Sequence, residues 1–241
     1  MTTKFFEKSR KERIDEIVKF AKLDPEERKI LEGHGGIGFE QADKMVENAI
    51  GTFSFPLGIA TNFVINNKEY LVPMVIEEPS VIAAASKAAK IAKIHGGFSM
   101  KNDESYSIGQ IQIINVNPKD ATQKILSHSK EILDLANTKS NTLSKMGKGA
   151  RELSCKEIST PAGTMLILEL LIDVGDAMGA NVTNTMCEGI ASLVEKISGG
   201  KVLLRILSNY STRRLVSGSA IFDKEELGGE QIVDNIILAY Q

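Results

Sequence analysis

The strongest constraint on the fold is a change of hydrophobic periodicity that recurs within residues 105–208. Ile108–Val116 alternates glutamine with isoleucine, and this period of two predicts a strand. Pro118–Lys139 instead repeats a pair of apolar residues after seven positions, at Ile125-Leu126 and at Ile132-Leu133, which predicts a helix. This part of the chain is therefore expected to begin as a strand that leads into a helix.

The remainder of this segment repeats the pattern after a predicted hairpin. Pro161-Ala162-Gly163 is a turn sequence between two strand-like runs, and a glycine pair ends the helical spacing that follows. The expected elements are strands at Ala150–Thr160, Thr164–Asp173 and Val202–Ile206, with a helix at Val182–Ile197. The order strand, helix, strand, strand, helix, strand predicts a ferredoxin-like split βαβ unit (βαββαβ) that is complete over residues 105–208.

The stretches on either side of this unit do not form closed units by themselves. The elements expected there are an amphipathic helix in residues 4–31, a hairpin from Thr52–Ile65 to Glu69–Ile76, and an alanine-rich helix at Val81–Ile94. We therefore expect an α+β protein. Its large α/β domain, residues 1–104 plus 209–241, is interrupted by a small inserted domain, residues 105–208.

Composition excludes several classes of function. The chain has 241 residues, of which 42% are hydrophobic, so it can bury a sizeable core. Its net charge of −2 and the lack of a basic stripe argue against non-specific electrostatic binding of nucleic acid. The most apolar run, Met165–Val174, is too short to span a bilayer, and Met1–Lys11 lacks the apolar run of a signal peptide. We expect a cytoplasmic protein with no membrane or nucleic-acid partner.

A ferredoxin-like sheet raises RNA binding as one alternative. Such a surface stacks bases on aromatic side chains of the central strands. Ile108–Val116 and Thr164–Asp173, the expected central strands, contain no aromatic residue. RNA binding is therefore disfavoured.

A metal site is not expected either. The three histidines, His34, His95 and His128, are isolated in the sequence, and we interpret them as structural. Cys155 and Cys187, the two cysteines, show neither metal-ligand spacing nor a disulfide framework.

The turn at Asp173–Asn181 is the first candidate site. Its small residues let a ligand approach the backbone, and the N-terminus of the following helix offers free N–H groups, which suits a phosphate-bearing cofactor. The alternative is a glycine turn in which Asp or Asn caps the next helix. Gly147-Lys148-Gly149 could neighbour a phosphate, but alone it indicates only a loop. The residues by themselves leave both interpretations open.

Glu77 and Glu78 form the second candidate site, at the start of the alanine-rich helix. Acidic residues in a first turn stabilise a helix through its macrodipole, which needs no further function. The functional alternative is that one of the two carboxyls is buried, kept protonated and used as a general acid. The helix N-terminus favours the carboxylate, so burial or a partner in the site would have to outweigh it.

Five short strings in the sequence are more specific than any of these patterns. They are Glu47–Thr52 (ENAIGT), Tyr70–Ser80 (YLVPMVIEEPS), Ala83–Ser86 (AAAS) with Gly96-Gly97-Phe98, Asp176–Asn181 (DAMGAN) followed by Asn184-Thr185-Met186, and Arg205–Asn209 (RILSN). Together they resemble hydroxymethylglutaryl-CoA reductase, of the soluble class typical of bacteria and some archaea. The resemblance runs almost from end to end of the chain.

The resemblance implies roles for particular residues. Glu78 matches the catalytic glutamate of the family, and Ser80 matches the serine that touches the hydroxymethylglutaryl group. The dinucleotide of the family lies on the small inserted domain. The residues implied there are Asp176, Met178, Gly179 and Asn181, which line the cofactor site, and Asn209, which faces the cofactor.

The family reaction that this implies belongs to mevalonate and isoprenoid metabolism. Two hydrides pass from NADPH or NADH to the thioester carbon of hydroxymethylglutaryl-CoA, through a hemithioacetal and an aldehyde, and yield mevalonate and free CoA. Each hydride places negative charge on an oxygen, which a proton donor or a cation must stabilise. Family sites form across a dimer interface, so a homodimer or a higher homo-oligomer is expected.

The sequence departs from the family pattern in two respects. The catalytic lysine, the aspartate and the flap histidine of the family lie beyond Gln241, so we expect this chain alone to be inactive. The alternative is a non-catalytic fragment that binds a dinucleotide or CoA. In addition, Ser140 stands where NADH-preferring relatives carry an aspartate, and Lys139 is adjacent. An aspartate would repel the 2′-phosphate of NADPH, so its replacement favours or at least tolerates NADPH.

Overall fold

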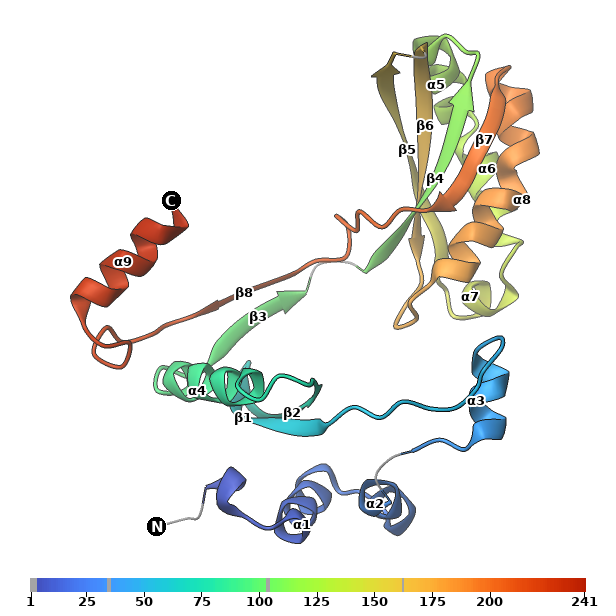
Figure 1. Ribbon diagram of the computed structural model, residues 1–241. Coiled ribbons are helices and arrows are strands. Elements are labelled where there is room, and N and C mark those ends of the chain that lie inside the picture. Colours follow the sequence, from blue (N-terminus) through green and yellow to red (C-terminus); the bar gives the residue numbers. More distant parts are fainter. Residues whose placement is uncertain (1–3, 34–35, 103–104, 162) are drawn as a thin grey trace. The chain divides into compact units, whose positions relative to one another are not determined.

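A computed structural model describes residues 4–33, 36–102, 105–161 and 163–241 (Figure 1). The chain separates into two compact units. The first contains residues 1–100 and 218–241, and the second contains residues 101–217. The two are called the large unit and the small unit below.

The large unit is built on a four-stranded sheet with the order β2-β1-β3-β8. Its elements are η1 (Phe5–Glu7), α1 (Arg10–Ala21), α2 (Pro25–Glu32), α3 (Phe39–Met45), β1 (Leu57–Ile65), β2 (Lys68–Val75), α4 (Val81–Lys93), β3 (Phe98–Asn102), β8 (Val216–Ala220) and α9 (Glu230–Tyr240). The predicted hairpin is confirmed, although its first strand begins at Leu57 and not at Thr52. Ile65 pairs with Lys68, and both Asn66 and Asn67 have positive φ angles, as a type I′ turn requires. Helix α4 packs against β1, burying Ala60 and Ala89 completely.

The small unit is a four-stranded sheet in which every neighbouring pair is antiparallel, with the order β5-β6-β4-β7. Its elements are β4 (Tyr106–Ile114), α5 (Pro118–Ser127), α6 (Ser129–Asn137), α7 (Asn141–Lys145), β5 (Gly149–Thr160), β6 (Gly163–Asp173), α8 (Ala180–Ser198) and β7 (Lys201–Leu207). The predicted strands of this segment are therefore confirmed, except that Ala162 of the hairpin turn lies outside the described residues.

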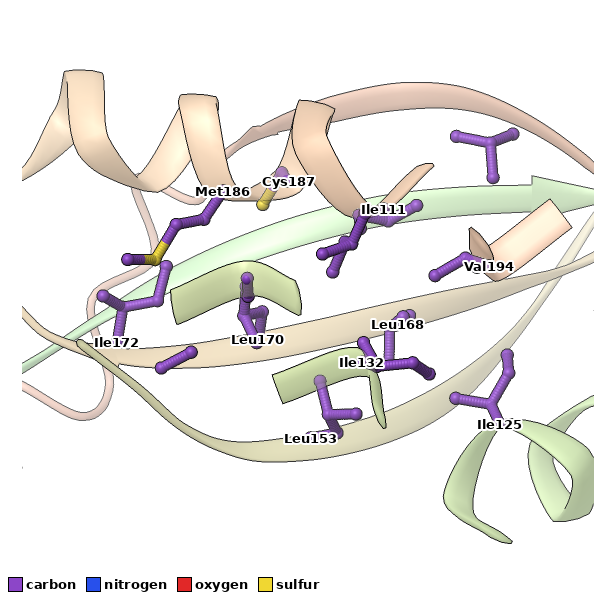
Figure 2. Close-up of a cluster of buried hydrophobic side chains, with 14 of the residues drawn as sticks. Ile111, Ile125, Ile132, Leu153, Leu168, Leu170, Ile172, Met186, Cys187 and Val194 are labelled. Carbon is purple, nitrogen blue, oxygen red and sulfur yellow. The ribbon is translucent and has the colours of Figure 1, made fainter. Parts of the chain in front are cut away.

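Alternate strand residues of the small unit pack on its helices in one buried cluster. Ile111 of β4 and Leu168 of β6 are fully buried together with Ile132 of α6 and Val194 of α8 (Figure 2). Because α5, α6 and α8 all contribute to this cluster, they cover the same face of the sheet. The period of two in the sequence thus reports which side chains face the helices.

Two expected helices are each interrupted. The helix expected in residues 4–31 breaks at Lys22, which adopts a left-handed conformation, and restarts at Pro25 behind the Asp24 N-cap. The helix expected at Pro118–Lys139 breaks at His128, where the His128 Nδ1 lies 2.8 Å from the carbonyl oxygen of Lys124. The hydrophobic spacing of Ile125-Leu126 and Ile132-Leu133 continues across this break and does not reveal it.

The cluster predicts a large difference between two leucine substitutions in the small unit. Leu168→Ala should lower the free energy of unfolding by about 2–5 kcal/mol, because it removes buried methyl groups and leaves a cavity. Leu203→Ala on β7 should cost less than about 1 kcal/mol, because that side chain is exposed. The buried Cys187 thiol reports unfolding of this unit, so its labelling by a thiol reagent across a urea series, read by peptide mass spectrometry, measures both losses. Equal losses would contradict this description of the core.

Candidate functional site

The candidate residues fall in both units, and the first group lies at the start of α4. The Ser80 hydroxyl lies 2.8 Å from each carboxylate oxygen of Glu78, and the Ser80 backbone N–H donates to Glu78 Oε2 at 3.2 Å. Ser80 is the N-cap residue of α4. The Glu78 carboxylate therefore satisfies a free N–H group at this helix end.

This arrangement differs from the buried acid considered from the sequence. Glu78 is exposed, as is Glu77. The hydrogen bond from the Ser80 hydroxyl, followed by the bond from the Ser80 N–H, lowers the pKa of Glu78 below its ordinary value. Glu78 is thus a carboxylate at neutral pH, and only burial of its side chain would raise its pKa enough for it to hold a proton there.

The second group lies in the turn between β6 and α8. Gly175 and Gly179 both have positive φ angles, of 61° and 87°. A side chain at Gly179 would meet the Val174 methyl groups at 2.7 Å and 2.8 Å, so only glycine fits there. Gly179 is also the N-cap of α8 and supplies no side-chain cap, which rules out an Asp or Asn side chain at that cap position. The Asp176 and Met178 side chains, which lie between these two glycines, are exposed.

Arg214 holds the same turn from a distant part of the chain. Its guanidinium donates to the carbonyl oxygen of Ala177 at 2.9 Å and to that of Met178 at 3.1 Å. The two ends of this contact are 36 and 37 residues apart, and no sequence pattern indicated it.

The strand register brings the remaining candidates to one end of the small sheet. Asp173, the last residue of β6, pairs with both Tyr106 and Gly149, the first residues of β4 and β5. At the same end, the N–H of Ser208 donates to the carbonyl oxygen of Ile108, immediately before the exposed Asn209. The turn into α8, the segment before β5 and the end of β7 therefore meet here.

Ser140 lies in the segment that leads to β5. Its hydroxyl oxygen accepts the Leu143 N–H at 3.3 Å and so caps α7. The Asn137 side chain holds this segment through two hydrogen bonds to the backbone of Ala150, at 2.8 Å and 3.1 Å. Lys139 lays its aliphatic stem over Gly189 of α8.

Comparison with known proteins decides the family. The protein-family model described as hydroxymethylglutaryl-coenzyme A reductase matches residues 9–241. The chain belongs to the hydroxymethylglutaryl-coenzyme A reductase family. It is 48% identical over 237 residues to the 3-hydroxy-3-methylglutaryl-coenzyme A reductase of Archaeoglobus fulgidus, covering 98% of this chain and 54% of the relative. A probable reductase of Borreliella burgdorferi is 32% identical over 187 residues, or 76% of this chain and 41% of the relative. The chain thus spans about half the length of these relatives.

Solved structures of family members share the fold. A reductase from Streptococcus pneumoniae superposes with a TM-score of 0.89 at 39% identity, covering 95% of this chain and 55% of that one. A class II reductase from the same organism, bound to NADPH in open conformations, gives a TM-score of 0.88 at 39% identity, with coverage of 96% and 62%. The resemblance drawn from the five sequence strings and the mixed α+β class are confirmed.

Two of the three histidines lie among the described residues, and each contacts a neighbouring polar group. His95 Nε2 lies 2.7 Å from Asp223 Oδ1, and His128 bonds within its own helix end. His34 lies outside the described residues. Among the described residues, no group of three or more His, Cys, Asp or Glu side chains is arranged to hold a metal ion. Among the helices formed by the described residues, none has the length and apolar character needed to cross a membrane.

The hydrogen bonds at Glu78 predict the effect of Ser80→Ala. Removing the hydroxyl takes away the largest cause of the lowered pKa, so the pKa of Glu78 should rise toward the ordinary glutamate value of about 4.3. Titration of the carboxyl carbons by NMR measures it. Glu69 is the internal control, because the side-chain hydrogen bond from Lys93 lowers its pKa and Ser80 takes no part. An unchanged Glu78 titration would contradict this account of its environment.

Proposed function

We propose that this chain is part of an enzyme that reduces the thioester of hydroxymethylglutaryl-CoA with NADPH or NADH and releases mevalonate and free CoA. The observation that carries the proposal is the family match over residues 9–241. The likeness to a reductase structure bound to NADPH supports the choice of cofactor. Since the chain spans 54% of the archaeal relative, the activity is proposed for the whole enzyme.

We also propose that the dinucleotide binds to an inserted ferredoxin-like domain at residues 105–208. Two observations support it: the strand order β5-β6-β4-β7, and the helices that connect β4 to β5 and β6 to β7. Residues 1–104 and 209–241 would then form the domain for hydroxymethylglutaryl-CoA. Residue 104, at the proposed boundary, lies outside the described residues.

The turn before α8 is the proposed place of the cofactor. Gly175 and Gly179 have positive φ angles that favour glycine, and the N-terminus of α8, which has no side-chain cap, suits a phosphate group. Asp176, Met178, Asn181 and Asn209 complete the proposed set of cofactor-binding residues around Gly179.

A preference for NADPH belongs to the same proposal. Ser140 offers a hydroxyl, and its neighbour Lys139 a positive charge, where an aspartate would repel a 2′-phosphate. The ratio of kcat/KM for the two cofactors in the full-length enzyme measures this preference. A strong preference for NADH would contradict it.

Glu78 is the proposed proton donor, and Ser80 the residue that touches the hydroxymethylglutaryl group. The nicotinamide supplies the hydride when it is bound. The oxygen of the thioester then gains negative charge, and a protonated Glu78 can neutralise it. Burial by the bound substrate would raise the pKa of the exposed carboxyl, which is the change that such a role requires.

The catalytic lysine, aspartate and histidine of the family match no residue of this chain. We therefore propose that the 241-residue chain alone is inactive, and that the complete enzyme is a cytoplasmic homodimer or higher homo-oligomer. The half-exposed Ile232, Ile236 and Ile237 of α9 support packing against further protein in the complete enzyme. A non-catalytic fragment that binds a dinucleotide or CoA is the alternative for the isolated chain.

The Glu78→Gln variant of the full-length enzyme tests the proposed activity. Because the amide keeps the shape and removes the acid, substrate-dependent oxidation of NADPH should fall by about 10²-fold or more, while cofactor affinity stays unchanged. Glu77→Gln is the matched control and should retain nearly full turnover. Wild-type turnover in Glu78→Gln would overturn the role of this residue, and a wild-type enzyme without any such activity would overturn the proposed function.

A further inference from the structure

Strand β1 contains a β-bulge beside helix α4. Its pairing with β2 is regular up to Ala60 and resumes at Phe63, and between them Thr61 and Asn62 lie opposite a single residue of β2. Asn62 adopts a left-handed conformation, with a φ angle of 70°. Asparagine tolerates this conformation better than most residues do, which favours the bulge at this point of the strand.

Ser86 of α4 is hydrogen-bonded to both residues of the bulge. Its hydroxyl oxygen accepts the backbone N–H of Thr61 at 3.0 Å, and its carbonyl oxygen accepts the side-chain amide of Asn62 at 3.1 Å. The hydroxyl in turn donates to the carbonyl oxygen of Ile82 at 2.8 Å, so it is used both as a donor and as an acceptor. All three bonds are partly buried, which strengthens them relative to exposed bonds.

A second contact holds the same helix one turn nearer its start. The Ile82 Cδ1 atom lies 2.5 Å from the point where a side chain at Gly58 would begin, so Ile82 fills the space over this glycine of β1. Apolar packing of this kind is non-directional and would let the helix shift along the strand, whereas hydrogen bonds require particular distances and angles. The bonds of Ser86 to the bulge therefore set the register of α4 on β1.

The register of α4 determines where the residues at its start lie. Ser80, the N-cap, precedes Ser86 by about 9 Å along the helix axis. The hydroxyl and the N–H of Ser80 bind the Glu78 carboxylate, so this carboxylate moves with the helix end. Since α4 is one helix from Val81 to Lys93, a shift at Ser86 is transmitted to Ser80 and Glu78.

We propose that Ser86 and Asn62 are positioning residues for the reduction, which hold the Glu78 carboxyl where it can protonate the substrate oxygen. The inference rests on the proposed function, in which Glu78 is the proton donor. Neither residue needs to touch the reacting atoms, because its effect passes through α4. A displacement of about 1 Å can lower a rate by about 10²-fold, so a small shift of the helix is enough.

Steady-state kinetics of the full-length enzyme, with hydroxymethylglutaryl-CoA and NADPH varied in turn, tests the proposal. Ser86→Ala removes the hydroxyl that accepts the Thr61 N–H. It should lower kcat about tenfold, while both KM values stay within about threefold of the wild type. Ser86→Thr retains a hydroxyl and should keep kcat within about threefold of the wild type.

Asn62→Gly tests the other side of the same contact. Glycine adopts positive φ angles without strain, so this variant keeps the bulge and loses only the side-chain amide. Its kcat should fall as in Ser86→Ala. Asn67→Gly is the matched control, because Asn67 has a positive φ angle of 65° in the same hairpin and an exposed side chain. This control should retain the kcat of the wild type.

The Glu78→Gln variant separates positioning from a general loss of structure. If Ser86 acts through Glu78, then adding Ser86→Ala to Glu78→Gln should lower the remaining activity by less than about twofold, because the acid that it positions is already gone. A loss of about tenfold in both backgrounds would indicate a purely structural role and overturn the inference.

The other outcomes also decide the question. The inference is overturned by an unchanged kcat in Ser86→Ala or Asn62→Gly, and by a loss in Ser86→Thr as large as in Ser86→Ala. A rise confined to the KM of hydroxymethylglutaryl-CoA overturns it in favour of a direct substrate contact. Circular dichroism verifies that each variant is folded.

Failure of the proposed function gives a different result. A wild-type enzyme that oxidises no NADPH in the presence of hydroxymethylglutaryl-CoA removes the function, and wild-type turnover in Glu78→Gln removes the role of Glu78. Failure of the inference alone leaves a wild-type enzyme that is active and depends on Glu78.

Discussion

The close packing of α8 against β4 is the contact on which the small unit depends. A side chain at Gly109 would overlap the Cys187 sulfur and come within 3.1 Å of the Thr183 Cγ2 atom, so the strand and the helix can approach only because glycine stands there. Burial raises the pKa of the Cys187 thiol to about 12, in keeping with a sulfur enclosed in apolar surroundings. The Thr183 hydroxyl, buried in the same contact, has no hydrogen-bond partner within the described part of the chain, which is a cost of packing this tightly.

This contact also positions the candidate cofactor site. Once α8 is fixed on the sheet, its first turn must follow the end of β6 through six residues, Val174–Gly179. Two positive φ angles make so short a connection possible, and Arg214 bonds to two of its carbonyl groups. The conformation of the turn therefore depends in part on packing that lies outside the site.

The sequence predicted those strands and turns in which the type of each residue follows directly from its own burial or backbone conformation. The alternation around Ile111 and Ile113 corresponds directly to burial, and the Asn66-Asn67 pair corresponds to the turn that it forms. It did not predict the helix break at His128, where the backbone leaves the helical conformation although the hydrophobic spacing continues. It also could not predict the contacts of Arg214 with the turn, because these join residues far apart in the chain. The sequence left open whether Glu78 is a buried acid or a carboxylate; its side chain is exposed, and the hydrogen bonds from Ser80 lower its pKa.

Amide hydrogen exchange of the 241-residue chain, with and without NADPH, tests the central claim most directly, namely that the turn before α8 binds the dinucleotide. The account predicts slower exchange of the backbone amides at residues 175–182 when NADPH is present, because those N–H groups lie at the bare turn and the uncapped helix start. Exchange in α4 of the large unit should not change. Binding of NADPH that protects the large unit, and leaves residues 175–182 as they were, would contradict the account.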